Sequence, residues 1–117
     1  MREGNIILTA ITQADGILKN RSALVLREMP KYGDLLICGI STQVRQYIPN
    51  FDEIIRIEDP DFETSGLVRE SLVRLAFLAI VKQTAVIGSI GSISNERHQK
   101  LLSNLSTYLI ESISELE

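Results

Sequence analysis

The chain has 117 residues, of which 44% are hydrophobic and 23% charged, and its formal net charge is −3. This length suits one folded domain over residues 1–117 with a single core, and no apolar run approaches the roughly 18 residues of a membrane span. The single cysteine, Cys38, excludes an internal disulfide framework and fits a reducing compartment. The first residues lack the apolar region of a secretion signal, so we expect a cytoplasmic protein without a membrane partner.

The charges are unevenly distributed along the chain. Residues 1–50 hold six basic and four acidic side chains, whereas residues 51–117 hold six basic and eleven acidic ones. The first part is therefore net positive and the second net negative. Because contacts to phosphate are made by local lysines and arginines, a site for a nucleic acid is expected in the first part.

Short apolar segments separated by turn residues predict a mainly β fold. The predicted strands cover residues 5–11, 19–26, 35–43, 53–57, 71–75 and 85–93. Residues 12–20 are expected to form a loop around the turn-favouring pair Asp15-Gly16, and residues 44–52 a polar connection. Residues 76–81 are nearly all apolar, which fits either the end of the preceding strand or a short buried connector. Gly88 and Gly91 predict a bend or bulge where a small barrel closes.

Four carboxylates cluster around Pro60, which raises the question of a metal site. They are Glu58, Asp59, Asp61 and Glu63. Their spacing does not match that of a calcium-binding loop, and no glycine stands at the sharp turn of such a loop. We therefore expect a solvated acidic loop and no metal.

The C-terminal region predicts one amphipathic helix over residues 95–115. Ser94 is expected to cap it, and Glu96 in its first turn suits the helix dipole. Its apolar face comprises Leu101, Leu105, Leu109, Ile113 and Leu116. This face is expected to pack against the sheet or against a second subunit. The only histidine, His98, falls early in this helix, which favours a packing or surface role and excludes catalysis by a pair of imidazoles.

Polar residues meet where two of the predicted strands end. If residues 19–26 and 35–43 pair antiparallel, Arg21 comes near Ser41, Thr42 and Gln43. A guanidinium would then lie beside two hydroxyls and a carboxamide, a group suited to binding a phosphate. Because side chains alternate along a strand, only one of Ser41 and Thr42 is expected to face this site, with Gln43 on the same side as Ser41.

Five segments, taken in order, resemble the MazF/PemK family of bacterial toxins. They are Gly4 to Leu8, Asn20 to Leu26 with Arg21 near its start, Gly39 to Gln43 with Ser41 near Gln43, Gly66-Leu67 followed by Ser71 to Leu75, and Ile90 to Ser94. The chain differs from the family pattern at two positions, with Ser22 in place of a proline and Asn5 in place of an aspartate. A proline would fix the corner between loop and strand.

The resemblance implies a small SH3-like antiparallel β-barrel of five to seven strands with a C-terminal helix. It implies a toxin of a type II toxin–antitoxin system that cuts single-stranded RNA or mRNA without a metal or cofactor and inhibits growth. Arg21 and Ser41 would be catalytic, and Lys19, Asn20, Thr42 and Gln43 would bind the substrate. Expected partners are a second copy of the chain, a cognate antitoxin and, only together with the antitoxin, operator DNA.

RNA carries its own nucleophile, the 2′-hydroxyl, so such an enzyme needs mainly to orient it and to stabilise charge on phosphorus. Arginine remains protonated at neutral pH, so Arg21 is assigned to charge stabilisation before proton transfer. The alternative is a non-catalytic member of the same fold that binds a protein, such as a gyrase-type target, or a nucleic acid as a regulator. Arg21 with Ser41 and Gln43 favours cleavage, whereas the acidic net charge and Ser22 favour binding.

Overall fold

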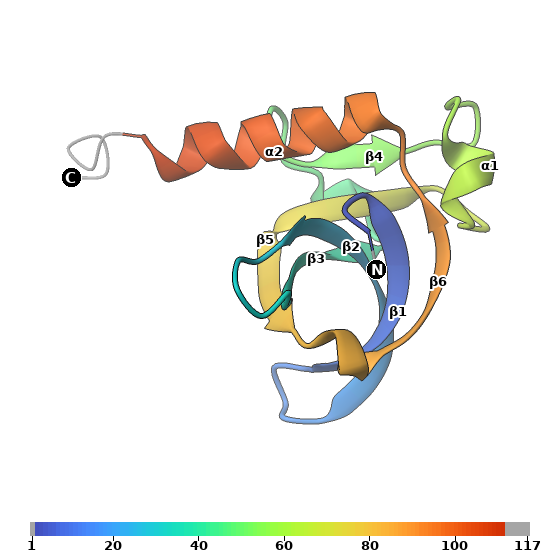
Figure 1. Cartoon of the computed structure of the whole chain (residues 1–117). Coiled ribbons are helices and arrows are strands. Elements are labelled where there is room, and N and C mark those ends of the chain that lie inside the picture. The colour runs from blue at the N-terminus through green and yellow to red at the C-terminus, as the bar shows by residue number, and fades with distance from the viewer. Residues whose placement is uncertain (1, 112–117) are drawn as a thin grey trace.

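The polypeptide folds into a curled antiparallel sheet with one helix laid across it (Figure 1). The computed structural model describes residues 2–111. The elements are β1 (Asn5–Thr12), β2 (Leu18–Glu28), β3 (Leu35–Ser41), η1 (Val44–Gln46), β4 (Glu53–Ile55), α1 (Phe62–Ser65), β5 (Ser71–Val81), η2 (Gln83–Ala85), β6 (Val86–Ser92) and α2 (Asn95–Leu109). The strand order in the sheet is β4-β5-β3-β2-β1-β6. The predicted mainly β fold with a C-terminal helix is confirmed.

The central strands are apolar on both faces because each face covers a core. In β2, Leu24 and Leu26 belong to one cluster, which also contains Leu101 and Leu105 of α2. Their neighbours in β2, at positions 23 and 25, belong to a second cluster on the other face. Side chains alternate along a strand, so a continuous apolar run is what a doubly covered strand requires. Burying each such leucine contributes about 1.5–3 kcal/mol.

The predicted antiparallel pairing of β2 with β3 is confirmed, and it stops short of one end of both strands. The two strands pair from Glu28 opposite Leu35 to Ala23 opposite Gly39, with a shift of register between Val25 and Arg27. Beyond that point the start of β2 pairs with β1, whereas the end of β3 pairs with β5. Within residues 2–111 no further ladder joins them there, so β2 and β3 separate at this end of the sheet.

A bulge in β5 lies next to this separation. Cys38 pairs with Leu78 but its neighbour Gly39 pairs with Arg74, so three residues of β5, from 75 to 77, have no partner in β3. The carboxylate of Asp52, which is 2% exposed, holds the bulge by accepting hydrogen bonds from Leu75 N at 3.1 Å and from Ile48 N at 3.1 Å.

Burial, with the nearby charge of Asp52 as a second cause, raises the pKa of the Cys38 thiol well above its usual range.

Helix α2 lies across one end of the sheet, over β4, and its C-terminal end extends beyond the sheet (Figure 1). Ser94 caps it as predicted, since its Oγ accepts a hydrogen bond from Arg97 N at 3.1 Å. His98 is buried, and its Nε2 lies 2.8 Å from the carbonyl oxygen of Leu26. His98 therefore has the expected packing role, and its contact with Leu26 joins α2 to β2.

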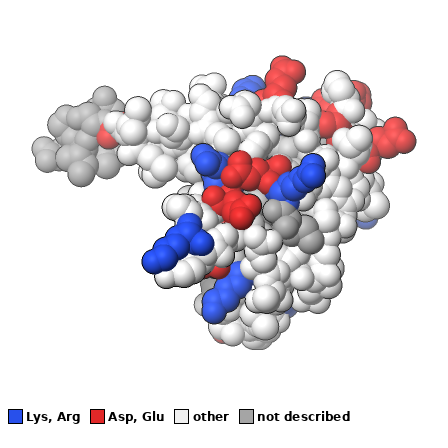
Figure 2. Space-filling view, viewed as in Figure 1, with Lys and Arg blue, Asp and Glu red and all other residues white. Residues whose placement is uncertain are grey.

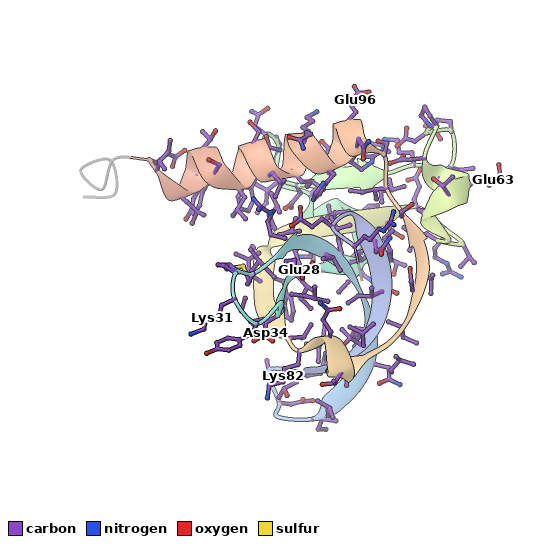
Figure 3. All side chains as sticks on the ribbon, in the orientation of Figure 1. Glu28, Lys31, Asp34, Glu63, Lys82 and Glu96 are labelled. Carbon is purple, nitrogen blue, oxygen red and sulfur yellow. The ribbon has the colours of Figure 1, made fainter. Side chains whose placement is uncertain are left out.

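The expectation of a solvated acidic loop is wrong for two of its four carboxylates. The guanidinium of Arg97, only 11% exposed, forms ion pairs with Asp61 at 2.9 Å, Asp59 at 2.8 Å and Glu53 at 3.0 Å. Burial alone would raise the pKa of the Asp61 carboxyl, but hydrogen bonds from Arg97 and Ser94 N outweigh it and hold that pKa below its ordinary value. Glu63 does remain at the surface, on α1 (Figure 3).

Two glycines of the motifs named above meet between α1 and β6. Gly66 ends α1 in the left-handed conformation, with φ of +74°. A Cβ on Gly66 would lie 1.9 Å from the carbonyl oxygen of Ile90, and one on Gly91 would lie 2.3 Å from that of Thr64. The backbones can approach this closely only because neither residue has a side chain.

Several predicted boundaries are wrong by a few residues. β2 begins at Leu18, so the loop after β1 covers only residues 13–17, where Asp15 Oδ1 accepts a hydrogen bond from Ile17 N and tightens the turn. β3 ends at Ser41, β4 at Ile55 and α2 at Leu109. Residues 76–81 continue β5 rather than forming a connector. The predicted helical positions Ile113 and Leu116 lie outside the described residues.

Candidate functional site

A hollow of about 600 Å³ opens where β2 and β3 separate. Arg21 and Asn20 line it from β2, Ser41 from the end of β3, and Thr42 and Gln43 from the residues that follow. Five of the six site residues predicted from the sequence therefore line one cavity. The sixth, Lys19, is exposed on β2 and is not part of the lining. The roles assigned to these residues stay predictions.

The hydroxyl of Ser41 is partly engaged in a turn. Its Oγ accepts a hydrogen bond from Gln43 N at 3.0 Å. A serine hydroxyl has two lone pairs and one hydrogen, so the hydrogen remains available to donate to a ligand. Because β3 ends at Ser41, strand alternation does not continue through Thr42, and both residues reach the hollow. The expectation that only one of them faces the site does not hold for this geometry.

Two arginines line the hollow from opposite sides of β3. Arg21 is exposed, and its Nη2 donates to Gln13 Oε1 at 3.2 Å. Arg74 comes from β5, where its backbone pairs with Gly39. Within the described part of the chain neither guanidinium forms an ion pair with a carboxylate. Both therefore keep donors for an anion, and a planar guanidinium matches two oxygens of a phosphate.

Sequence reasoning missed Arg74 as a site residue, although a signal for it existed. Arg74 lies in Ser71 to Leu75, which belongs to one of the five segments on which the resemblance rests. It also missed Gln13 and Gln46, which reach the hollow from the β1–β2 loop and from η1. No spacing rule brings either glutamine to β3, because both depend on how the connections fold back.

The lining of the hollow is positively charged although the chain as a whole is acidic. Figure 2 shows that one face of the molecule carries acidic and basic side chains close together rather than a continuous basic surface. The described lining of the hollow contains two arginines, four carboxamide side chains and no carboxylate. Its local charge is therefore positive in a chain with a net charge of −3, and local charge governs the binding of a phosphate.

Over residues 2–111, no three His, Cys, Asp or Glu side chains are grouped so that they could hold a metal ion. Neither α1 nor α2 is long and apolar enough to cross a membrane.

Comparison with known proteins agrees with the fold and with the motifs. No curated protein sequence matches the chain. Residues 2–109 match the sequence profile of a family described as PemK-like, MazF-like toxin of type II toxin–antitoxin system. This match covers nearly the whole chain, and the curled sheet with its C-terminal helix is consistent with that fold. The chain therefore belongs to the PemK-like, MazF-like toxin family of type II toxin–antitoxin systems.

Proposed function

We propose that this toxin is an endoribonuclease that cuts single-stranded RNA, including mRNA, in the cytoplasm without a metal ion, and thereby inhibits growth. The observation that supports it best is the composition of the hollow. Two guanidiniums without carboxylate partners, those of Arg21 and Arg74, lie in one cavity with the hydroxyl of Ser41. That set suits a substrate which brings its own nucleophile and develops negative charge on the oxygens bound to phosphorus.

The proposed reaction is an internal transesterification. The 2′-oxygen forms a bond to phosphorus and the bond from phosphorus to the 5′-oxygen breaks. The 2′-hydroxyl loses a proton and the leaving 5′-oxygen gains one, so the products are a 2′,3′-cyclic phosphate and a 5′-hydroxyl end. Arg21 and Arg74 stabilise the charge on the phosphorane. Ser41, whose Oγ accepts from Gln43 N, donates its hydroxyl hydrogen to a phosphate oxygen. Preorganised donors of this kind contribute about 3–4 kcal/mol each.

The family has a cognate antitoxin, and a toxin of this kind is expected to be silenced when that protein binds it. We propose further that the toxin is a homodimer, and that it contacts operator DNA only together with the antitoxin. Asn20, Thr42 and Gln43 line the same hollow as the two arginines, so we assign them to substrate binding. Lys19 is assigned to the approach of the RNA strand, outside the hollow itself.

The test is cleavage of a long RNA by antitoxin-free protein in the presence of EDTA. We expect Arg21→Ala to cost about 3 kcal/mol, roughly a hundredfold in rate. A copy of the RNA with a 2′-deoxy nucleotide at the cut site should remain intact, because its nucleophile is missing.

Lys31→Gln is the matched control for the loss of one positive charge. Lys31 lies in the turn between β2 and β3 (Figure 3), at the end of these strands opposite the hollow. The Lys31→Gln variant should cut RNA as fast as the unaltered chain. Cleavage of the deoxy copy would contradict the mechanism, and undiminished cleavage by Arg21→Ala would contradict the site. If well-folded protein cuts no RNA, this result supports the alternative function, a non-catalytic binding protein.

A further inference from the structure

Among the described residues that line the hollow, Phe77 has the only aromatic ring. It is the last residue of the bulge in β5, immediately before Leu78, where pairing with β3 resumes. Leu75, Ala76 and Leu78 line a second hollow beside α2, whereas Phe77 lines the one that holds the arginines. The bulge thus turns this one ring towards the candidate site, as bulges near active sites commonly do.

The position of Phe77 is set by its contact with Gly39 and by the bulge that precedes it. A Cβ built on Gly39 would lie 3.2 Å from Phe77 Cδ1 and 3.3 Å from Cγ, so the ring rests against a position where any larger residue would crowd it. The bulge behind it is fixed by the buried carboxylate of Asp52 through Leu75 N. The side chain is nevertheless 37% exposed, which leaves part of the ring open to a ligand.

Carboxamides accompany this ring in the lining. Asn20, Gln43 and Gln46 each offer one donor group and one acceptor. A carboxamide can bind the edge of a nucleic-acid base through both groups at once, whereas arginines bind the phosphate. The ring can cover the face of a base, the carboxamides can bind its edge, and the two guanidiniums, which lack carboxylate partners, can bind the phosphate.

We infer that Phe77, supported by Gly39, is a stacking platform for one unpaired base, and that Asn20, Gln43 and Gln46 select this base by its edge. The inference rests on the proposed function in taking RNA as the ligand. It adds a reason why the substrate must be single-stranded, since a base inside a duplex cannot reach the ring. It also assigns sequence preference to the residues around Phe77 rather than to Arg21 and Ser41.

The experiment measures binding, so that it does not depend on cleavage. The probes are short single strands of mixed sequence with hydrogen in place of every 2′-hydroxyl, and copies of each with one abasic position. The unaltered chain should bind one abasic copy about tenfold to a hundredfold more weakly than the intact strand. Phe77→Leu should bind the intact strand more weakly by a similar factor and should no longer distinguish that abasic copy.

Two further variants sharpen the test. The chain contains no tryptophan, so Phe77→Trp places a single indole at the platform. It should bind the intact strand at least as well as the unaltered chain, and its fluorescence should be quenched by the intact strand more than by the sensitive abasic copy. Tyr32→Leu, which removes an aromatic ring that is 80% exposed in the β2–β3 turn, is the matched control and should bind normally.

The outcomes separate this inference from the proposed function. If Phe77→Leu is folded, as judged by thermal unfolding, and binds every probe like the unaltered chain, the platform is refuted even where Arg21-dependent cleavage of RNA persists. If the chain cuts no RNA but its binding of the deoxy strands depends on Phe77, the platform stands and the nuclease proposal falls.

Discussion

Arginine serves two opposite purposes in this protein, and the neighbouring carboxylates decide which. Arg97 is nearly buried and contacts three carboxylates, so its charge is neutralised where it lies. Arg21 is exposed, and its Nη2 donates a hydrogen bond to the neutral carboxamide of Gln13. A guanidinium already paired with carboxylates has little attraction left for a phosphate. Among the arginines described, Arg21 and Arg74 combine a place in the hollow with the lack of such a partner.

Ser41 offers a prediction at the scale of one residue. Ser41→Ala removes both the acceptor for Gln43 N and the hydrogen offered to the substrate, so we expect a lower kcat/KM together with a small loss of stability, about 1 kcal/mol. Ser41→Thr keeps both functions of the hydroxyl and should restore them. RNA cleavage measured well below the unfolding temperature, beside thermal unfolding of each variant, distinguishes the two effects. An alanine variant that cuts at the normal rate would remove Ser41 from the mechanism.

At the scale of elements, α2 is joined to the sheet mainly at its N-terminal end. Ser94, Arg97 and His98 all make contacts with other segments there, and Leu101 and Leu105 complete the core beneath the helix. Residues near the other end of the helix are exposed, including Leu109 at 66% and Ile110 at 79%. The helix from its cap at Ser94 to Leu105 is therefore part of the fold, whereas Leu109 and Ile110 beyond it are exposed.

Arg97→Met should destabilise the protein strongly, because the buried carboxylate of Asp61 loses its ion pair and keeps only the hydrogen bond from Ser94 N among the contacts described. Removing one member of a buried ion pair costs about 3–5 kcal/mol. The matched control is Lys100→Met, which breaks an ion pair with Glu53 from a side chain that is 64% exposed. Such a surface pair is worth about 0–1 kcal/mol. Urea unfolding followed by circular dichroism measures both, and equal losses would contradict the importance given to the buried cluster.

For the whole molecule, exposed apolar surface favours association of two copies. Several large apolar side chains remain at least 40% exposed on β5, on β6 and at the end of α2: Leu78, Ile80, Ile87, Ile90, Tyr108, Leu109 and Ile110. A second hollow, of about 690 Å³, also lies between α2, β5 and the loop before β4. We expect sedimentation at micromolar concentration to show a species of twice 13.1 kDa. A single species of 13.1 kDa would contradict the proposed homodimer.

The parts of the structure that sequence could predict are those set by neighbouring residues. Apolar runs and turn residues fixed the strands, the β2–β3 hairpin and the cap at Ser94, and the hairpin brought Arg21 towards Ser41. The bulge that turns Phe77 into the hollow could not be predicted, because it depends on Asp52, a residue far away in the chain. The pairing of Arg97 with the acidic segment depends in the same way on how α2 lies over β4. Both need knowledge of the packed molecule.

Because β6 lies beside β1, the protein can complete its folding only late in its synthesis. Ile7 pairs with Ser89, so strands from opposite ends of the chain are neighbours in the sheet. A growing chain leaves the ribosome N-terminus first, and pairing across so long a separation is slow. β1, β2 and β3 are therefore synthesised well before β6 and α2 can enclose the core. We expect the nascent toxin to remain incompletely packed, and hence inactive, until its last strand and helix have been made.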